Sequence, residues 1–472
     1  MSECAMSEFD YDLIALGSGP AGQRAAIQAA KLGKRVAVVE HKAVVGGTCI
    51  NTGTIPSKTL REAALHFSGY QERSIYGASY SVKSDIAMGD LFYRMEHVIA
   101  NELDTTRHQL QRNGVDLISA DASFIDAHTI RLKSIEGVGS REVTTDFAVI
   151  AVGTETTKDS HVEFDGRRIF TSDDLLHLPE LPKSMAVVGA GVIGLEYATI
   201  FAALGVRVTL IDKRPRLLTF VDSEIIDTLV YQLRQNRMTM RLGEAVNAVE
   251  KYTDDRGDRV RIRLASGKQI LADNALYSVG RTGSTSTLGL EKLGIDVIER
   301  ELLSVNENYQ TVVPNIYAVG DVIGFPSLAS TSMEQGRHAS CHAFGVDPGN
   351  KSTVLPYGIY TIPEISVIGQ NEEELTEAGV PYEIGKASYR EISRGQIIGD
   401  SIGMLKLLFH METRELLGVA ILGEGASELI HIGQAVLQLG GTIDYFVNTV
   451  FNYPTLAECY KTAALDGINR MG

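Results

Sequence analysis

The sequence predicts an α/β protein in which one strand–turn–helix–strand unit occurs twice, followed by a separate α+β domain. Two glycine-rich turns, at residues 17–22 (GSGPAG) and 189–194 (GAGVIG), each lie between an apolar run and a helical stretch. A third apolar run ends in Gly-Asp at residues 320–321. From about residue 355 the pattern changes to short strand-like runs, and these precede a helical stretch at residues 426–439.

Length and composition bound the class of protein. A chain of 472 residues is too long for one hydrophobic core, so two to four domains are expected. The net charge of −15 argues against nucleic acid or anionic lipid as a partner. The apolar runs are too short to cross a membrane, and the polar, acidic start does not resemble a signal peptide. We therefore expect a cytoplasmic protein that does not bind membranes.

Cysteine and histidine usage predicts neither a disulfide framework nor a metal site. The four cysteines, Cys4, Cys49, Cys341 and Cys459, are scattered, and none forms a Cys-x-x-Cys pair. We see no metal-ligand spacing among the 11 histidines. No metal is predicted.

The repeated unit has the features of a dinucleotide-binding fold. The first copy closes with an acid, Glu40, and the second with Asp212, each 18 residues after the third glycine. In such a unit the first glycine permits a tight turn, the second lets backbone approach a pyrophosphate, and the third lets the helix pack on the strand. The acid accepts ribose hydroxyls, and the helix N-terminus favours phosphate. We predict two Rossmann-like sites, with the glycines Gly17, Gly19 and Gly22 in the first and Gly189, Gly191 and Gly194 in the second.

Other segments are predicted less specifically. The acid Asp321 ends a strand before a helical stretch at residues 328–344, which suits a second cofactor contact or, alternatively, a helix N-cap. Residues 165–184, with two prolines, are expected to form a linker. Residues 250–276 alternate apolar and charged side chains around turns and are expected to form an antiparallel meander.

Residues 46–58 (GGTCINTGTIPSK) resemble the active-site helix of the flavoprotein disulfide reductases. This family of class I pyridine nucleotide-disulfide oxidoreductases includes lipoamide dehydrogenase and glutathione reductase. The likeness covers essentially the whole chain and includes residues 151–154 (AVGT), 279–281 (VGR) and 454–456 (PTL). It implies FAD in the first nucleotide site, NAD(P)(H) in the second, and a homodimer or a larger homo-oligomer.

The resemblance also implies a division into domains. Their expected bounds are 1–160 for the first part of an FAD-binding domain, 161–282 for an NAD(P)-binding domain, 283–350 for a central domain completing the FAD site, and 351–472 for an interface domain that forms the dimer.

Roles for single residues follow from the same resemblance. Glu40 would bind the FAD ribose and Asp321 its ribityl chain. Lys58 would lie near flavin N5, paired with Glu196, because a cation there stabilises the reduced ring; an ordinary surface pair is the alternative. The remaining residues implied at the FAD site are Gly47, Thr48, Cys49, Gly153, Arg281 and Gly320, and Gly280 joins Glu196 at the NAD(P) site.

Two departures from the family pattern decide the predicted function. The family has Cys-x4-Cys, but here Cys49 is followed by Thr54, whose hydroxyl cannot form a disulfide or exchange thiols. Tyr453 stands where the family has a histidine base, although Glu458 is retained. A phenol with a pKa of about 10 is a poor base at neutral pH. Both changes remove the dithiol half-reaction.

Hydride must therefore enter and leave the flavin through the nicotinamide pocket. Residues 54–58 and 452–455 resemble those of the soluble transhydrogenase branch, which implies an Si-specific NAD(P)⁺ transhydrogenase. NADPH and NAD⁺ would use the pocket in turn. Asp212 suits the ribose of NAD(H), while Lys213 and Arg214, with Arg216 nearby, suit the 2′-phosphate of NADP(H). A solvated basic turn is the alternative for these cations.

Three other functions stay open. An NAD(P)H:quinone or oxygen reductase would keep the reduction of the flavin by NAD(P)H and change only the electron acceptor. A disulfide reductase would need Cys459 to face Cys49 across a dimer. A non-enzymatic flavin-binding protein would have no need for Lys58 and Glu196.

Overall fold

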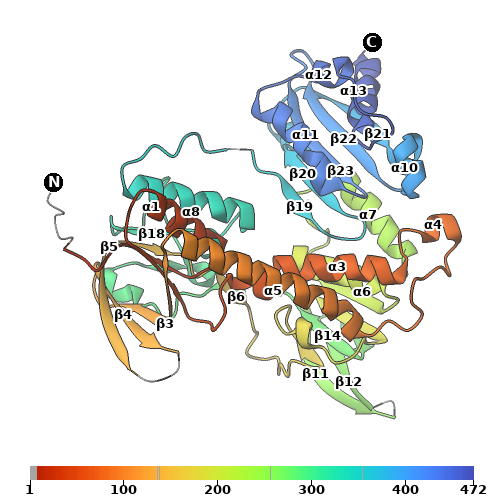
Figure 1. Ribbon diagram of the computed structural model, residues 1–472. Coiled ribbons are helices and arrows are strands. Elements are labelled where there is room, and N and C mark those ends of the chain that lie inside the picture. The colour runs from red at the N-terminus through yellow and green to blue at the C-terminus, as the bar shows by residue number, and fades with distance from the viewer. Residues whose placement is uncertain (1–7, 136, 138, 256, 353, 472) are drawn as a thin grey trace. The chain divides into compact units, whose positions relative to one another are not determined.

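The structure is a computed structural model that describes residues 8–135, 137, 139–255, 257–352 and 354–471 (Figure 1). Cys4 lies outside the described residues. Within the described ranges, no helix is long and apolar enough to cross a membrane. The chain forms two compact units: unit 1 comprises Met1–Thr59, Tyr93–Thr157 and Gly280–Lys351, and unit 2 comprises Leu60–Phe92, Lys158–Val279 and Ser352–Gly472.

Unit 1 is built on a six-stranded sheet with apolar side chains on both faces. Its strands, in spatial order, are β1 (Tyr11–Leu16), β2 (Val36–Glu40), β3 (Asp116–Phe124), β4 (Thr129–Ser134), β5 (Ser140–Ile150) and β18 (Ile316–Ala318), and β1 also pairs with β5. β3, β2, β1, β5 and β18 pair in parallel, and the end of β3, β4 and the start of β5 form an antiparallel meander. Leu13 and Ile14, which are adjacent in β1, lie in different buried clusters. A parallel sheet covered on both faces explains the continuous apolar runs in the sequence.

Two helices cover one face of this sheet at close range. Helices α1 (Pro20–Lys31) and α8 (Ala329–Ala343) lie side by side in Figure 1. A Cβ on Gly336 would lie 2.1 Å from the carbonyl oxygen of Ala21, so only glycine lets the two backbones approach this closely. This contact brings the third predicted element, which ends in Asp321, to the helix of the first glycine turn.

Short strands and helices complete unit 1. The strand pairs are β6 (Thr154–Thr156) with β15 (Arg281–Gly283), and β16 (Val297–Ile298) with β17 (Leu302–Leu303). The helices are α2 (Gly47–Asn51), η2 (Leu290–Leu293), η3 (Glu299–Glu301) and η4 (Gly320–Ile323). Two helices, α3 (Thr54–Ser68) and α5 (Met88–Arg112), continue from one unit into the other.

The second copy of the repeat lies in unit 2. Its parallel sheet has the order β10 (Thr239–Leu242), β9 (Arg207–Asp212), β8 (Ser184–Val188), β14 (Asn274–Tyr277) and β7 (Ile169–Phe170), with helices α6 (Val192–Ala203) and α7 (Ser223–Gln235). The predicted meander is confirmed for β11 (Val246–Asp254), β12 (Gly257–Leu264) and β13 (Gln269–Ala272). The prediction also placed β14 in this meander. In the structure β14 instead pairs in parallel with β8 and belongs to the nucleotide sheet.

The C-terminal part of unit 2 is the predicted α+β domain. Its antiparallel sheet has the order β19 (Tyr357–Ile359), β20 (Ile365–Gly369), β23 (Leu416–Leu422), β22 (Met404–His410) and β21 (Tyr382–Ser388). Helices α11 (Ala426–Gln438) and α13 (Glu458–Met471) pack on it, and a Cβ on Gly385 would lie 2.0 Å from the oxygen of Ala463. The short helices of unit 2 are α4 (Arg73–Tyr76), η1 (Leu175–His177), α9 (Glu372–Glu377), η5 (Tyr389–Glu391), α10 (Ser393–Ile398) and α12 (Asp444–Asn448).

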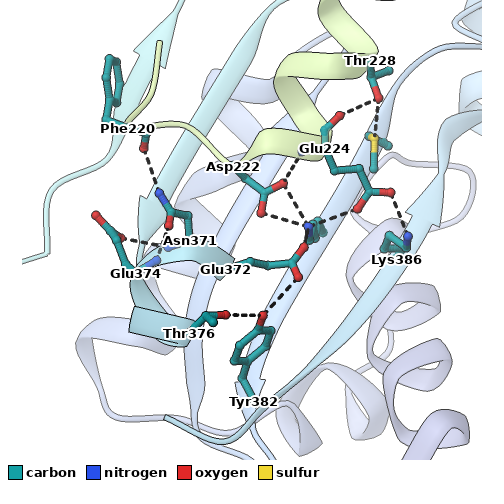
Figure 2. Close-up of polar contacts among 12 residues, drawn as sticks. Phe220, Asp222, Glu224, Thr228, Asn371, Glu372, Glu374, Thr376, Tyr382 and Lys386 are labelled. Carbon is teal, nitrogen blue, oxygen red and sulfur yellow. Dashed lines mark hydrogen bonds and ion pairs between the residues drawn. The ribbon is translucent and has the colours of Figure 1, made fainter. Parts of the chain in front are cut away.

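A buried ion network ties α7 and α9 to strand β22. Figure 2 shows the carboxylates of Asp222, Glu224 and Glu372 pointing toward one another. Lys406 is fully buried, and its Nζ lies 2.9 Å from Asp222, 3.1 Å from Glu224 and within hydrogen-bonding reach of Glu372. Burial would lower the pKa of Lys406, but hydrogen bonds to these acids raise it. Among the described residues these acids form the one group close enough to hold a metal ion, and the lysine ammonium already lies between them.

We expect Lys406→Met to lower the free energy of unfolding of unit 2 by about 3–5 kcal/mol, because buried carboxylates would lose their cation. Lys386→Met is the matched control, since Lys386 pairs with Glu224 but keeps 34% of its side chain exposed, and it should cost at most about 1 kcal/mol. Chemical denaturation of both variants measures the difference. Equal losses would contradict the assignment of the network's stability to Lys406.

Candidate functional site

The two glycine turns have nearly the same backbone. Gly17 and Gly189 have φ of +105° and +99°, which favours glycine over any residue with a side chain. Gly19 and Gly191 are the N-caps of α1 and α6, with φ, ψ of −66°, 178° and −72°, 179°. No side chain of the described residues caps either helix. Both N-termini therefore present backbone N–H groups to an anion, as the motif predicts.

The space around the glycines explains why a side chain is excluded at some positions of the turns and not at others. A Cβ on Gly22 would lie 1.9 Å from the oxygen of Gly17, and one on Gly194 would lie 2.0 Å from that of Gly189. By contrast, a Cβ on Gly19 or Gly191 would meet nothing within 4 Å. The middle glycine of each motif thus faces open space, which is the side where a pyrophosphate would approach.

Glu40 holds the first turn together from the end of β2. Its Oε2 accepts hydrogen bonds from the backbone N–H and the hydroxyl of Ser18, and its Oε1 accepts one from the N–H of Lys42 at 2.9 Å. Burial would raise the pKa of Glu40, but the hydrogen bonds from His41, Ser18 and Lys42 lower it to about 2. The carboxylate is therefore charged at every physiological pH.

The segment after Glu40 closes over this turn. The backbone N–H of Gly46 donates to the Ser18 hydroxyl at 2.9 Å, and Gly47 has φ of +59°. A Cβ on Gly47 would lie 2.9 Å from the Cα of Gly19, so glycine is required where the two turns meet. Thr48, the next residue, accepts backbone hydrogen bonds from residues 52 and 53 and so closes the short helix α2.

Cys49 and Thr54 are neighbours in space as well as in sequence. Burial raises the pKa of the Cys49 thiol, and the hydrogen-bonding effect of the nearby Thr54 side chain opposes this only in part. A protonated thiol beside a hydroxyl is a poor nucleophile and has no disulfide partner here. Lys58 follows one turn later on α3 and donates to the Ser57 hydroxyl at 3.3 Å.

Asp321 opens η4 directly after Gly320. The N–H of Gly320 donates to Gln335 at 2.8 Å, which fixes the start of η4 against α8. Burial raises the pKa of Asp321, and the positive charge of Arg281 opposes this. No hydrogen bond to the Asp321 side chain is found among the described residues, so its oxygens can accept from a ligand hydroxyl.

Arg281 is the first residue of strand β15, and Gly153 immediately precedes its partner strand β6. Arg281 donates to the hydroxyl of Thr154 at 2.8 Å and to its carbonyl oxygen at 2.6 Å. Gly153 has φ of +65°, and Gly280, immediately before β15, has φ of +139°. Unit 1 therefore contains every residue predicted for the first nucleotide site, together with Gly280 from the second.

Asp212 and Arg214 form a tight pair at the end of β9. The guanidinium donates through Nε to Oδ1 at 2.9 Å and through Nη2 to Oδ2 at 2.7 Å. Asp212 also accepts from the backbone N–H of Arg214 at 2.8 Å and of Ala190 at 2.7 Å. Burial would raise the pKa of Asp212, but these hydrogen bonds lower it. The sequence predicted both residues at this site but not that they bind each other.

Glu196 lies on α6, two residues after Gly194, the last glycine of the second motif. It is buried, and its Oε1 accepts from the backbone N–H of Tyr360 at 2.9 Å. Glu196 belongs to unit 2 and Lys58 to unit 1, so their pairing stays a prediction.

The C-terminal motif lacks a catalytic base of the family's kind. Tyr453 is 72% exposed, and its hydroxyl lies 2.7 Å from that of Ser393. Glu458 starts α13, and its Oε2 is buried without a hydrogen-bond partner among the described residues. Cys459 is fully buried, and burial raises the pKa of its thiol to about 12. This burial argues against Cys459 as a substitute thiol.

The family follows from comparison with known proteins. The family model described as pyridine nucleotide-disulphide oxidoreductase matches residues 11–336, and the model for its dimerisation domain matches residues 355–464. The chain belongs to this family. The family predicted from residues 46–58 is thus confirmed, as is the predicted fold class of two nucleotide-binding α/β domains and an α+β dimerisation domain.

Curated relatives of this family member cover almost its full length. A protein of Mycobacterium tuberculosis (strain ATCC 25177 / H37Ra), named soluble pyridine nucleotide transhydrogenase, is 52% identical over 98% of each chain. A protein of the same name from Pseudomonas aeruginosa (strain LESB58) is 45% identical over 99% of this chain and 100% of its own.

Solved structures share the family fold at lower identity. LpdA from Mycobacterium tuberculosis matches with a TM-score of 0.88 and 26% identity over 96% of this chain and 98% of its own. RclA from Escherichia coli, described as an HOCl-induced flavoprotein disulfide reductase, matches with a TM-score of 0.85 and 27% identity over 96% and 99%.

Sequence reasoning missed several residues that shape these sites. Ser18 links Glu40 to Gly46, and Gln335 holds Gly320, but neither was predicted to act. Ser18 lies between the first two glycines of the motif, and this position was the one available sign that it helps to shape the turn. Gln335 lies 15 residues after Gly320 and reaches it because α8 packs against η4.

We expect Glu40→Gln to lower the free energy of unfolding of the flavin-free protein at pH 7 by about 3 kcal/mol. Because the pKa of Glu40 is depressed from 4.5 to about 2, its stabilisation is present above pH 4.5 and is lost as the pH falls toward 2. Urea unfolding at pH 7 and in the acid range should therefore show a large gap between the wild type and Glu40→Gln at pH 7 that closes in acid. A gap independent of pH would contradict the assignment.

Proposed function

We propose that the chain is an FAD-dependent NAD(P)⁺ transhydrogenase, which moves hydride reversibly from NADPH to NAD⁺. One observation carries the proposal: Cys49 meets a threonine hydroxyl where the family pattern has a second cysteine, while both glycine turns keep complete geometry. A dithiol substrate has no thiol pair to react with, but two dinucleotides have sites. The names of the curated relatives support the same activity.

The first site fits FAD by several features of unit 1. The uncapped N-terminus of α1 suits the pyrophosphate, and the space beside Gly19 admits it. Glu40 would accept the ribose hydroxyls, and Asp321, without a hydrogen-bond partner in the described structure, would accept from the ribityl chain. The remaining residues that we assign to FAD are Gly17, Gly22, Gly47, Thr48, Cys49, Lys58, Gly153, Arg281 and Gly320. When bound, FAD supplies a ring that accepts and returns hydride.

The second site would hold each nicotinamide nucleotide in turn. We assign its pyrophosphate to the N-terminus of α6 and its adenosine ribose to the turn after β9. NADPH loses one hydride and leaves as NADP⁺, and NAD⁺ gains that hydride and leaves as NADH. No net proton or outside reductant is needed, and one pocket serves both half-reactions.

Lys58 and Glu196 are the residues to which we assign catalysis. A lysine ammonium near the flavin N5 would stabilise negative charge during hydride transfer, and Glu196 would orient it. Cys49 stays a neutral thiol because burial raises its pKa, so it adds no competing negative charge.

Purified protein should oxidise NADPH only when a NAD⁺ analogue with a distinguishable reduced form is present. Lipoamide and oxidised glutathione should give no turnover, because Thr54 cannot complete a disulfide. Rapid turnover of either disulfide, without transfer between nucleotides, would refute the proposal. Turnover of a quinone in place of the NAD⁺ analogue would favour the quinone-reductase alternative instead.

Lys58→Met should slow anaerobic bleaching of the flavin by NADPH about 100-fold, because one preorganised charge at the reacting ring is lost. Lys83→Met, which removes a surface lysine paired with Asp90, is the matched control. Stopped-flow absorbance measures both. An unchanged bleaching rate in Lys58→Met would remove this residue from the mechanism.

Finer features of the activity and assembly are also proposed. The dimerisation-domain match at residues 355–464 supports a homodimer. We further propose the four-domain division stated above, a cytoplasmic location, and Si-specific transfer.

NADPH deuterated on one face of nicotinamide C4 should pass its label to NAD⁺ for the Si-face epimer alone; transfer of both labels would contradict this stereochemistry.

A further inference from the structure

We propose that Arg214 competes with the ribose diol of NAD(H) for Asp212, so that this one arginine sets the balance between NAD(H) and NADP(H). The inference rests on the proposed function, because a transhydrogenase must admit both nucleotides to one site. It goes further in giving Arg214 opposite effects on the two substrates.

The first argument is the occupancy of the Asp212 carboxylate. Each of its oxygens accepts one bond from a backbone N–H, of Arg214 on Oδ1 and of Ala190 on Oδ2. Each also accepts one bond from the guanidinium, at 2.9 Å and 2.7 Å. A carboxylate offers about two lone-pair positions on each oxygen, so the group is full.

The second argument is that the guanidinium occupies the positions that NAD(H) needs. The vicinal 2′ and 3′ hydroxyls of a ribose would donate one bond to each oxygen, as the arginine fork does. The two backbone bonds remain in either state. NAD(H) can therefore bind Asp212 fully only after the Arg214 side chain has moved away, which costs a charge-assisted bidentate contact.

NADP(H) does not face this cost. Its 2′-hydroxyl carries a phosphate, which Asp212 would repel if it were unpaired. Arg214 binds Asp212 through Nε and Nη2, and this leaves its Nη1 edge for the phosphate. The same arginine can thus neutralise the acid and receive the anion.

The surrounding backbone allows the side chain to move alone. The carbonyl oxygens of Asp212 and Arg214 accept bonds at 3.0 Å from the N–H groups of Glu244 and Gly243. The Arg214 side chain is 47% exposed, whereas that of Asp212 is 6% exposed. A rotamer change of Arg214 therefore suffices, and the acid stays where it is.

The neighbouring cations differ from Arg214 in their surroundings. Lys213 is exposed, and no contact of its side chain with Asp212 is found in the described structure. Arg216 lies near another acid, Glu373. Burial would raise the pKa of Glu373, but a hydrogen bond from Ser223 and the charges of Arg216 and Lys406 lower it. Lys213 can therefore aid a phosphate without competing for Asp212.

The test is calorimetric binding of NADP⁺ and NAD⁺ to the oxidised, flavin-loaded protein. Arg214→Ala should raise the Kd of NADP⁺ about 10- to 100-fold. The same change should lower the Kd of NAD⁺ about 2- to 5-fold, because Asp212 is released. Lys213→Ala should raise the Kd of NADP⁺ without lowering the Kd of NAD⁺. Arg207→Ala removes an arginine from the opposite end of β9, and both Kd values should stay within about twofold.

Arg214→Lys is a second variant that controls for misfolding of Arg214→Ala, because it keeps the positive charge but cannot bind both carboxylate oxygens. It should lose less NADP⁺ affinity than Arg214→Ala and should still tighten NAD⁺. Weaker or unchanged NAD⁺ binding in both Arg214 variants, with flavin content retained, would overturn the competition. Because oxidised nucleotides bind without turnover, this result is independent of the proposed function. A protein that shows the opposite shifts but moves no hydride would refute that function alone.

Discussion

Both nucleotide sites depend on a carboxylate that closes the glycine turn from the end of the second strand of its strand–turn–helix–strand repeat. Glu40 accepts the backbone N–H of Ser18, and Asp212 accepts that of Ala190, the equivalent residue of the second turn. Each bond holds the turn so that the N–H groups of the following helix face outward. The acid therefore shapes the anion site before any ribose is bound, and both acids stay ionised because their hydrogen bonds outweigh the cost of burial.

The two acids differ in what else they bind, and this difference matches the two proposed ligands. Glu40 is held by the Ser18 hydroxyl, by backbone N–H groups and by the imidazole of the adjacent His41. Asp212 is held by a guanidinium, which is charged and half exposed. A site for a permanently bound cofactor needs a fixed acceptor. A site that must exchange two nucleotides differing by one phosphate benefits from a cation that can change partner.

The chemistry of the first site is limited by one atom. With oxygen at position 54, the Cys49 thiol has a hydroxyl nearby but no sulfur partner. At the C-terminal motif Tyr453 is exposed, and the Oε2 of Glu458 is buried with no hydrogen-bond partner among the described residues. The nucleotide-binding geometry does not depend on either feature, because the glycine turns are set by backbone sterics and by the acids. Loss of dithiol chemistry is therefore compatible with complete nucleotide sites.

The sequence alone determined the repeated unit, the order of its elements and the family. Periodicity, glycine spacing and the terminal acids are local patterns, and backbone sterics translate them directly into a turn and a parallel strand pair. It did not reveal that Arg214 binds Asp212, because a basic residue near an acid is equally compatible with a solvated turn. Nor did it predict the burial of Lys406, on strand β22, among three acids at the N-terminal ends of helices α7 and α9, which lie far apart in the chain. The contacts of Lys406 were decided by tertiary packing, since a side chain's partners depend on which surfaces meet when the chain folds.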